Sequence, residues 1–293
     1  MFFHLIRLAR PYQWVKNLFL FLPVFFGGKI LDLASLRNAA AGFICFSLVS
    51  SSIYCLNDII DKEVDKKHPT KSKRPVAAGN ISVPGAALFM LGLILAALLL
   101  LYMAHVHSFY ETVFIIVCYL SINIAYSLKL KKIAILDVMI IAVGFVLRIF
   151  AGGSSTGIVL SKWIVMMVFL LTLVLALGKR KDDVLLFSRT GVKPRENTDC
   201  YSAPFVDMSI VFISSVTMVC YIMYTVSSEV MERMGTSSVY LTSVFVLAGM
   251  IRYLQIAVID NLTGDPTKLL LRDGFIQICL LCWIASFLGM IYV

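Results

Sequence analysis

Charged side chains are scarce in this sequence. Asp, Glu, Lys and Arg together make up 15% of the 293 residues, whereas 60% of the residues are hydrophobic. Soluble domains carry roughly 25% charged residues, and a soluble core cannot hide so many apolar side chains. The composition therefore excludes an ordinary soluble protein and predicts a membrane protein whose surplus apolar side chains face lipid.

Histidine is also scarce, and the cysteines show no disulfide or metal-binding pattern. Only four histidines occur, and only His68 lies near a polar motif. Six of the seven cysteines lie in apolar runs. Cys279 and Cys282 are spaced C-x-x-C but lack the polar setting of a zinc or redox site, so we interpret the cysteines as small core residues. We expect no cleavable signal peptide, because no small-residue cleavage site ends the first apolar stretch.

Long apolar runs dominate the rest of the chain. A bilayer core needs about 20 apolar residues per helix, and the sequence predicts nine such spans within a single domain, 1–293. Pro23, Gly27 and Gly28 interrupt the first span, and a short amphipathic segment, Phe2 to Tyr12, precedes it. The nine spans are expected at 17–35, 38–56, 83–104, 109–128, 133–151, 159–178, 205–227, 237–258 and 274–292.

Most of the 26 lysines and arginines fall on one side of this arrangement if the N-terminus is cytoplasmic. The cationic side of a membrane protein faces the cytoplasm. We therefore predict a cytoplasmic N-terminus, an outer C-terminus and a net positive charge of +9 concentrated at the cytoplasmic face. The longest polar stretches, 57–82 and 179–203, are both predicted inner loops.

One of these loops carries the residues that suggest chemistry. Asn57, Asp61 and Asp65 are spaced i, i+4, i+8, so they stack on one face if the second span continues as a helix. Asp58 points elsewhere. Oxygen ligands suit Mg²⁺, which usually binds one or two carboxylates together with substrate phosphates. The cations that follow suit phosphate oxygens; they are Lys71, Lys73 and Arg74. The pattern predicts a diphosphate site, and a solvated, charge-laced helix end is the alternative.

The motif N-D-x-x-D-x-x-x-D, after the second of nine spans, resembles the first aspartate-rich motif of the UbiA prenyltransferase superfamily. Asn57, Asp58, Asp61 and Asp65 match it. The resemblance implies an all-α integral membrane bundle around a central cavity, with Mg²⁺ and pyrophosphate held at its cytoplasmic end. It also suggests self-association, with a trimer as one form, in the plasma (inner) membrane.

Further motifs resemble one branch of this superfamily, the polyprenyl-phosphate phosphoribosyltransferases. Residues 10–17 read R-P-x-Q-W-x-K-N, and Gly178-Lys179-Arg180 stands where a prenyltransferase would have a second D-x-x-x-D motif. Asp183 departs from the glutamate that this branch tends to have. The other matching segments are His68-Pro69-Thr70-Lys71 with Arg74-Pro75, Tyr126 to Lys131, Asp137, Arg148, Ile251 to Leu254, and Gly264-Asp265-Pro266.

The resemblance implies a glycosyltransferase of cell wall biogenesis that moves 5-phosphoribose from phosphoribosyl pyrophosphate to a membrane polyprenyl phosphate. Its cofactor is expected to be Mg²⁺, held by Asn57, Asp58, Asp61 and Asp65, of which Asn57, Asp61 and Asp65 are the expected catalytic residues. We expect no nucleic-acid partner. The expected substrate-binding residues are Lys16, Asn17, Lys71, Arg74, Tyr126, Lys129, Arg148, Lys179, Arg180, Asp183 and Arg252.

Two other functions stay open at this point. A true prenyltransferase, moving an isoprenyl group from its diphosphate to an aromatic acceptor, would use the same fold and the same first motif. The cations Lys179 and Arg180 argue against it. A transporter or lipid-binding membrane protein would explain the spans but not three stacked oxygen side chains beside a basic loop. For Asp137 and Arg148, a structural pairing with another helix is the alternative to a functional role.

Overall fold

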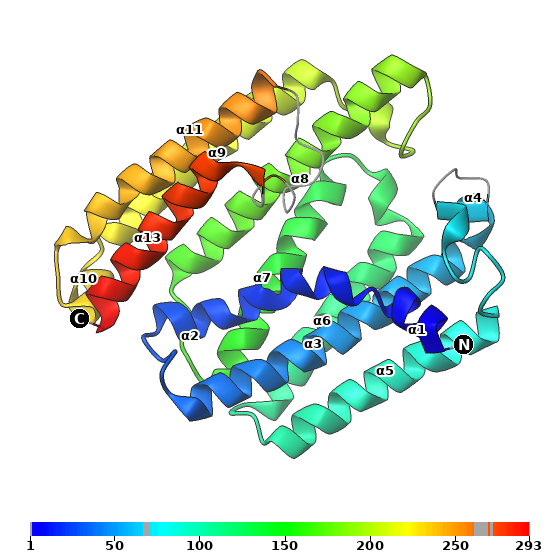
Figure 1. Cartoon of the computed structure of the whole chain (residues 1–293), viewed down its shortest axis with the longest axis horizontal. Coiled ribbons are helices and arrows are strands. Elements are labelled where there is room, and N and C mark those ends of the chain that lie inside the picture. Colours follow the sequence, from blue (N-terminus) through cyan, green and yellow to red (C-terminus); the bar gives the residue numbers. More distant parts are fainter. Residues whose placement is uncertain (1, 67–70, 261–268, 270–271, 293) are drawn as a thin grey trace. The chain divides into compact units, whose positions relative to one another are not determined.

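The computed structural model describes residues 2–66, 71–260, 269 and 272–292, and in this part of the chain every regular element is helical (Figure 1). The motif residues His68, Pro69, Thr70 and 264–266 lie outside it. The elements are α1 (Phe2–Ala9), η1 (Pro11–Phe21), α2 (Leu22–Phe26), α3 (Leu33–Ile60), α4 (Lys62–Lys66), η2 (Lys71–Lys73), α5 (Val83–Ala104), α6 (Phe109–Leu128), η3 (Leu130–Lys132), α7 (Leu136–Thr156), α8 (Lys162–Thr190), η4 (Thr198–Cys200), α9 (Ala203–Thr225), α10 (Ser228–Met234), η5 (Ser238–Thr242), α11 (Ser243–Val258) and α13 (Gly274–Tyr292).

Eight helical segments of the described chain are long and apolar enough to cross a membrane. The chain is therefore an all-α integral membrane protein, as its composition predicts. The first predicted span, 17–35, falls on η1 and α2 and on the turn that follows them. Eleven 3₁₀ residues and five α residues together rise about 30 Å, close to the thickness of a bilayer core. The count of nine spans and the cytoplasmic N-terminus stay predictions.

The helices group into two compact units, of which the first comprises Met1–Leu130 and Val146–Leu160. α3 is its central element, because α1, η1, α5 and α6 all pack against it (Figure 1). Asp32 starts α3 by accepting a hydrogen bond from the Ser35 amide, and a carboxylate at this position satisfies an otherwise orphaned donor. Phe46, Val49 and Tyr119 are among the buried residues of the unit's core.

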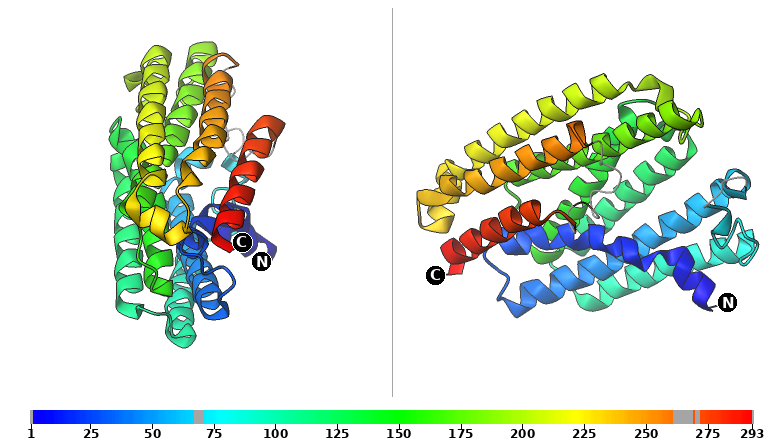
Figure 2. Two further views of the ribbon diagram at one scale, coloured as in Figure 1. Left: turned by 90° about the vertical axis from the view of Figure 1, so that its left-hand side faces the viewer. Right: turned by 45° about the horizontal axis from the view of Figure 1, so that its top comes forward.

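The second unit comprises Lys131–Phe145 and Ser161–Val293. α8 packs along α9, α9 packs against α11, and α11 packs against α13 (Figure 2). Its core includes Val174, Leu177, Val206 and Ile210. α8 continues as a helix through a cationic stretch to Thr190 and ends at Gly191, whose positive φ of 69° suits a residue without a side chain. The functional residues at the end of α8 therefore sit on regular helix.

Candidate functional site

The end of α3 keeps the helical register of the predicted oxygen ligands. The Asp61 amide donates to the Asn57 carbonyl at 2.9 Å, and the Asp65 amide donates to the Asp61 carbonyl at 2.8 Å. Asp61 caps α3, and α4 resumes at Lys62. The i, i+4, i+8 spacing of Asn57, Asp61 and Asp65 therefore survives in the backbone, despite the change of helix between them.

Cations hold two of the four motif carboxyl and amide side chains. Arg10 donates to Asp58 Oδ1, and Arg74 Nη1 donates to Asp65 Oδ2 at 2.6 Å. Arg74 also lies 3.5 Å from Asp58 Oδ1. Asp58 and Asp65 are almost fully buried, at 1% and 2% exposure, so these cations offset charges that would otherwise be costly to bury.

Asn57 faces a different neighbour from Asp58. Ser127 on α6 donates to Asn57 Oδ1, whereas Asp58 pairs with the residue that precedes η1. Adjacent residues on a helix project about 100° apart, which explains why one turns to α6 and the other to Arg10. Tyr126 and Lys129 lie beside Ser127 at the end of α6, and Lys129 is exposed. In this unit the end of α6 therefore meets the end of α3 through the bond between Ser127 and Asn57, and Arg74 reaches the same motif at Asp58 and Asp65.

The donor set fits Mg²⁺ in its chemistry. Asn57, Asp61 and Asp65 offer one amide oxygen and two carboxylates, and Mg²⁺ commonly takes one or two carboxylates with substrate phosphates completing its shell. Within the described residues, no three or more His, Cys, Asp or Glu side chains are grouped so that they could hold a metal ion. An amide oxygen and substrate phosphates would have to complete the metal's shell. Asp58 Oδ2 is buried and has no hydrogen-bond partner in the described part of the chain.

A second polar group of the first unit lies within its apolar core. Asn17 on η1 donates to Ser47 at 2.9 Å and accepts from Arg148 Nε at 2.8 Å. Arg148 Nη2 donates to the Tyr119 hydroxyl at 3.2 Å, and the guanidinium lies 5.2 Å from the Phe46 ring centroid and 5.1 Å from that of Tyr119. Arg148 therefore joins α7 to η1, α3 and α6, and Lys16 is the half-buried neighbour of Asn17.

The second unit holds its own ionic cluster at the end of α8. Arg180 Nε donates to Asp137 Oδ2 and Arg180 Nη1 donates to Asp183 Oδ2, each at 2.7 Å. Arg195 also donates to Asp183, at 2.9 Å. Arg180 is 1% exposed, and its Nη2 has no hydrogen-bond partner in the described part of the chain. Asp137 therefore pairs with another helix, while Lys179 is exposed.

Tyr201 completes this cluster. Its hydroxyl donates to Asp137 Oδ1 at 2.6 Å and accepts the Ile135 amide at 2.7 Å. Burial and the hydrogen bond to Asp137 raise the pKa of the Tyr201 phenol above its ordinary value, so the phenol stays a donor at neutral pH. Ile135 has a φ of 69°, which is costly for a β-branched residue. The Tyr201 hydroxyl fixes this strained residue at the start of α7.

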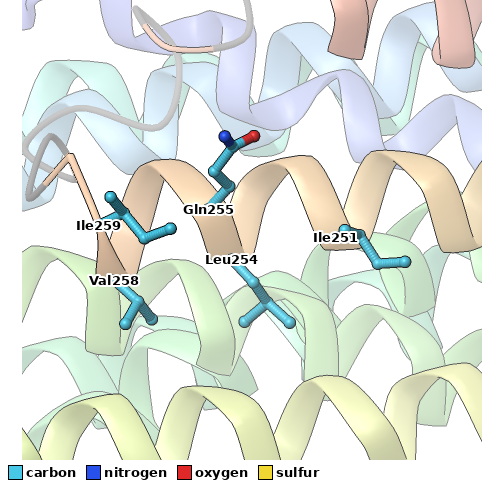
Figure 3. Close-up of a pocket in the computed structure, with 5 residues that line it drawn as sticks. All are labelled: Ile251, Leu254, Gln255, Val258 and Ile259. Atoms are coloured by element: carbon cyan, nitrogen blue, oxygen red, sulfur yellow. The ribbon is translucent and has the colours of Figure 1, made fainter.

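Arg252 has a different setting from the other predicted substrate-binding residues. It donates to Asp273 through Nε and Nη2, at 3.0 Å and 2.8 Å, and to Gln255 through Nη1 at 2.8 Å. An apolar pocket of about 470 Å³ lies beside it along α11, lined by Ile251, Leu254, Gln255, Val258 and Ile259 (Figure 3). No titratable side chain lines this pocket, so it offers no chemistry of its own.

Comparison with known proteins identifies the fold and the family. The model of the UbiA prenyltransferase family matches residues 20–186. The chain belongs to the UbiA prenyltransferase family. Decaprenyl-phosphate phosphoribosyltransferase from Mycolicibacterium smegmatis is 30% identical over 98% of this chain and 92% of the relative. The enzyme of that name from Corynebacterium glutamicum is 29% identical over 99% of this chain and 87% of the relative.

Solved structures agree with the family assignment at the level of fold. A UbiA homolog from Archaeoglobus fulgidus, bound to GPP and Mg²⁺, superposes with a TM-score of 0.73. The two chains are 23% identical, and the match covers 99% of this chain and all of the other. This UbiA-family chain therefore has the UbiA fold.

Sequence reasoning missed several residues of these clusters. The sequence assigns Arg10 to the N-terminal motif alone, whereas in the structure it pairs with Asp58 across 48 positions. Tyr201 carries no local signal, because its partner Asp137 lies 64 positions earlier in the sequence. Arg195 pairs with Asp183 across 12 positions, from the loop that follows α8. For Arg10 the signal was present: a buried aspartate in a UbiA-family motif needs a cation, and Arg10 stands in the conspicuous R-P-x-Q-W-x-K-N segment.

Proposed function

We propose that this protein transfers 5-phosphoribose from phosphoribosyl pyrophosphate to a membrane polyprenyl phosphate and releases pyrophosphate. The observation that carries this proposal is the chain-long similarity, near 30% identity, to proteins named decaprenyl-phosphate phosphoribosyltransferase. Lys179 and Arg180 support it, because cations replace the second acidic motif that a prenyl diphosphate enzyme would carry.

The reaction needs one bond exchange. A phosphate oxygen of the acceptor forms a bond to the anomeric carbon of the ribose, while the bond from that carbon to the pyrophosphate oxygen breaks and pyrophosphate keeps the electron pair. The sugar carbon gains oxocarbenium character, as in other glycosyl transfers. The acceptor is already an anion, so no general base is required. This agrees with a site in which the motif side chains are oxygen ligands and cations.

Asn57, Asp61 and Asp65 would hold Mg²⁺. A metal held by these residues would supply positive charge to the leaving pyrophosphate. Asp58 would support this arrangement through Arg10, because its carboxylate turns to that cation. Lys71 and Arg74 follow on the same unit as phosphate contacts, together with Lys129. Arg74 also fixes Asp65.

The second unit offers separate phosphate contacts. Lys179 is exposed at the end of α8, and Arg180 has its Nη2 uncommitted within the described residues. Asp137 and Asp183 would orient the guanidinium so that this nitrogen is available. In the first unit, Arg148 and Asn17 would fix η1 beside α3 rather than touch the reacting atoms, and Arg252 would have a similar supporting role through Asp273.

A lipid-labelling assay tests the proposal. Purified protein receives phosphoribosyl pyrophosphate labelled in the ribose, a polyprenyl phosphate and Mg²⁺, with EDTA in a parallel reaction. We expect a labelled lipid only with Mg²⁺, and its loss in Asp61→Asn. Glu63→Gln, which removes an exposed carboxylate of α4, is the matched control. Labelled lipid that forms equally in EDTA would overturn the metal requirement.

A second candidate function rests on the archaeal neighbour that was solved with GPP and Mg²⁺. In this alternative, the protein moves an isoprenyl group from its diphosphate to an aromatic acceptor. Supplying labelled geranyl or farnesyl diphosphate with an aromatic acid separates the two. Consumption of the diphosphate, without any labelling from phosphoribosyl pyrophosphate, would favour the prenyltransferase.

We further propose that the protein resides in the plasma (inner) membrane, that its active site faces the cytoplasm, and that it self-associates, with a trimer as one form. We also propose that the chain forms a single domain around a central cavity. Cationic side chains concentrated in the predicted inner loops support the orientation. Mass measurement in detergent or nanodiscs tests the oligomeric state.

A further inference from the structure

A cationic pocket of about 210 Å³ lies at the end of α1, outside the face of α3 that carries Asn57. Arg7, Arg10, Tyr12, Asp58, Lys73, Arg74 and Pro75 line it. All of these residues belong to the first unit. Arg7 and Lys73 are exposed, and neither forms an ion pair within the described residues. The pocket therefore gathers four cations from α1, the residue before η1, and the loop around η2.

The charges of this pocket are unbalanced. Asp58 is the carboxylate in its lining, and Arg10 and Arg74 both approach it. Asp65 offsets Arg74 from outside the lining, at 2.6 Å. Four cations against these two carboxylates leave about two positive charges. A phosphate monoester carries about −1.5 to −2 charges at neutral pH, whereas a phosphodiester carries one, so the monoester is the better match.

An apolar stripe leads away from the pocket. In a 3₁₀ helix, residues three apart line up on one face, and Tyr12, Val15 and Leu18 of η1 are 71%, 46% and 51% exposed. A neighbouring row of the same helix carries Asn17 and Leu20, at 1% and 0% exposure. The stripe begins at Tyr12, which also lines the pocket, and extends about 12 Å at about 2 Å per residue.

We propose that this pocket binds the phosphate monoester of a single-chain lipid, whose hydrocarbon chain lies along Tyr12, Val15 and Leu18. The proposal rests on the proposed function, because it assigns to the acceptor a place separate from the Asn57 and Asp61 face. Arg7, Arg10 and Lys73 contact the acceptor phosphate, and Arg74 links it to Asp65. The unusually long 3₁₀ helix creates the stripe, because an α-helix would scatter residues 12, 15 and 18 around a wider arc.

A binding experiment tests this without any transfer reaction. Protein in nanodiscs of neutral phosphatidylcholine receives a radiolabelled polyprenyl phosphate, in EDTA and without phosphoribosyl pyrophosphate. We expect saturable binding that weakens about tenfold or more in Arg7→Gln and in Lys73→Gln, since each substitution removes a charge-assisted contact. Arg37→Gln removes an exposed cation at the other end of α3 and should bind like the wild type.

Competitors identify the ligand chemistry. Unlabelled polyprenyl phosphate should displace the label, whereas polyprenol, inorganic phosphate and phosphatidylglycerol at equal concentration should not. Leu18→Asn should weaken binding of polyprenyl phosphate but leave binding of the short geranyl phosphate unchanged. Equal competition by phosphatidylglycerol would overturn the assignment to a monoester, and wild-type binding by the double variant Arg7→Gln/Lys73→Gln would overturn the site.

The outcomes separate this inference from the proposed function. Binding that depends on Arg7 and Lys73 supports the site even if no phosphoribose is transferred. Transfer that proceeds with unchanged affinity for polyprenyl phosphate in both variants supports the proposed function and contradicts this acceptor site.

Discussion

Arg10 combines an unfavourable backbone conformation with two favourable side-chain contacts. Its φ is 52°, in the left-handed region that costs a residue with a side chain about 1–2 kcal/mol. In return, its guanidinium pairs with buried Asp58 and lies 5.0 Å from the Tyr54 ring centroid. The contacts of the Arg10 side chain thus offset the cost of its backbone conformation in the turn between α1 and η1.

Replacing Arg10 should destabilise the first unit. Arg10→Ala leaves the Asp58 carboxylate buried with only Arg74 nearby, and breaking a buried pair typically costs about 3–5 kcal/mol. We expect a clearly lower melting temperature in detergent, with partial recovery in Arg10→Ala/Asp58→Asn because the orphaned charge is then removed. Arg37→Ala is the exposed control. An unchanged melting temperature for Arg10→Ala would show that the pair is dispensable.

In the second unit, Tyr201 holds a buried aspartate, Asp137, as Arg10 does in the first. Tyr201→Phe removes the donor to Asp137 and the acceptor of the strained Ile135 amide, which should cost about 1–3 kcal/mol. Because the pKa of this phenol is raised in the folded protein, the advantage over Tyr201→Phe is complete below the unfolded pKa of about 10 and declines above it. Melting temperatures of both proteins across this range check the size and the direction. A difference that grows with rising pH contradicts this account.

At the scale of elements, η1 is fixed by the close approach of α7. A Cβ added to Gly152 would come within 2.2 Å of the Leu20 carbonyl oxygen, so no larger residue fits without moving the backbone. Gly152→Ala should lower stability by about 1–3 kcal/mol through overpacking. Gly92→Ala on α5 meets nothing within 4 Å and should be neutral or stabilising. Thermal unfolding of the two variants compares them, and equal stability would mean that η1 moves freely from α7.

The sequence predicts the long helices better than the short ones. The predicted spans 83–104 and 109–128 coincide with α5 and α6, because uninterrupted apolar runs with polar ends leave little choice. The span 38–56 is too short compared with α3, since Asp32 caps the helix earlier and the ladder continues past the apolar run to Ile60. η1 could not be anticipated, because a 3₁₀ helix of eleven residues depends on tertiary contacts at Asn17 and Gly152.

In the candidate site, too, local features were predictable from the sequence and long-range contacts were not. The register of Asn57, Asp61 and Asp65 was predictable, because residues four apart stack on any helix. The pairs Arg10 with Asp58 and Tyr201 with Asp137 were not, since each joins distant segments. Arg180 has one ion pair of each kind. Its pairing with Asp183 is local, at i and i+3, and follows from helix geometry, whereas its pairing with Asp137 depends on how α7 and α8 pack.

At the scale of the whole molecule, the orientation in the membrane is directly testable. The predicted topology places Cys200 inside and Glu232 outside. In a protein without other cysteines, an impermeant maleimide added to intact cells should label Glu232→Cys, at an exposed position of α10, but not Cys200, which is exposed. Labelling of Cys200 should require permeabilised cells. The reverse pattern would invert the topology and place the Asn57 face on the outer side.

The most direct test of the account follows both parts of the donor in one reaction. Phosphoribosyl pyrophosphate labelled with ¹⁴C in the ribose and with ³²P in the pyrophosphate is supplied with a polyprenyl phosphate and Mg²⁺. Phosphoribosyl transfer should give ¹⁴C in the lipid fraction, ³²P in free pyrophosphate, and neither product in Asp61→Asn. Lipid that carries both labels, or a lipid that stays unlabelled while a prenyl diphosphate is consumed, would contradict phosphoribosyl transfer.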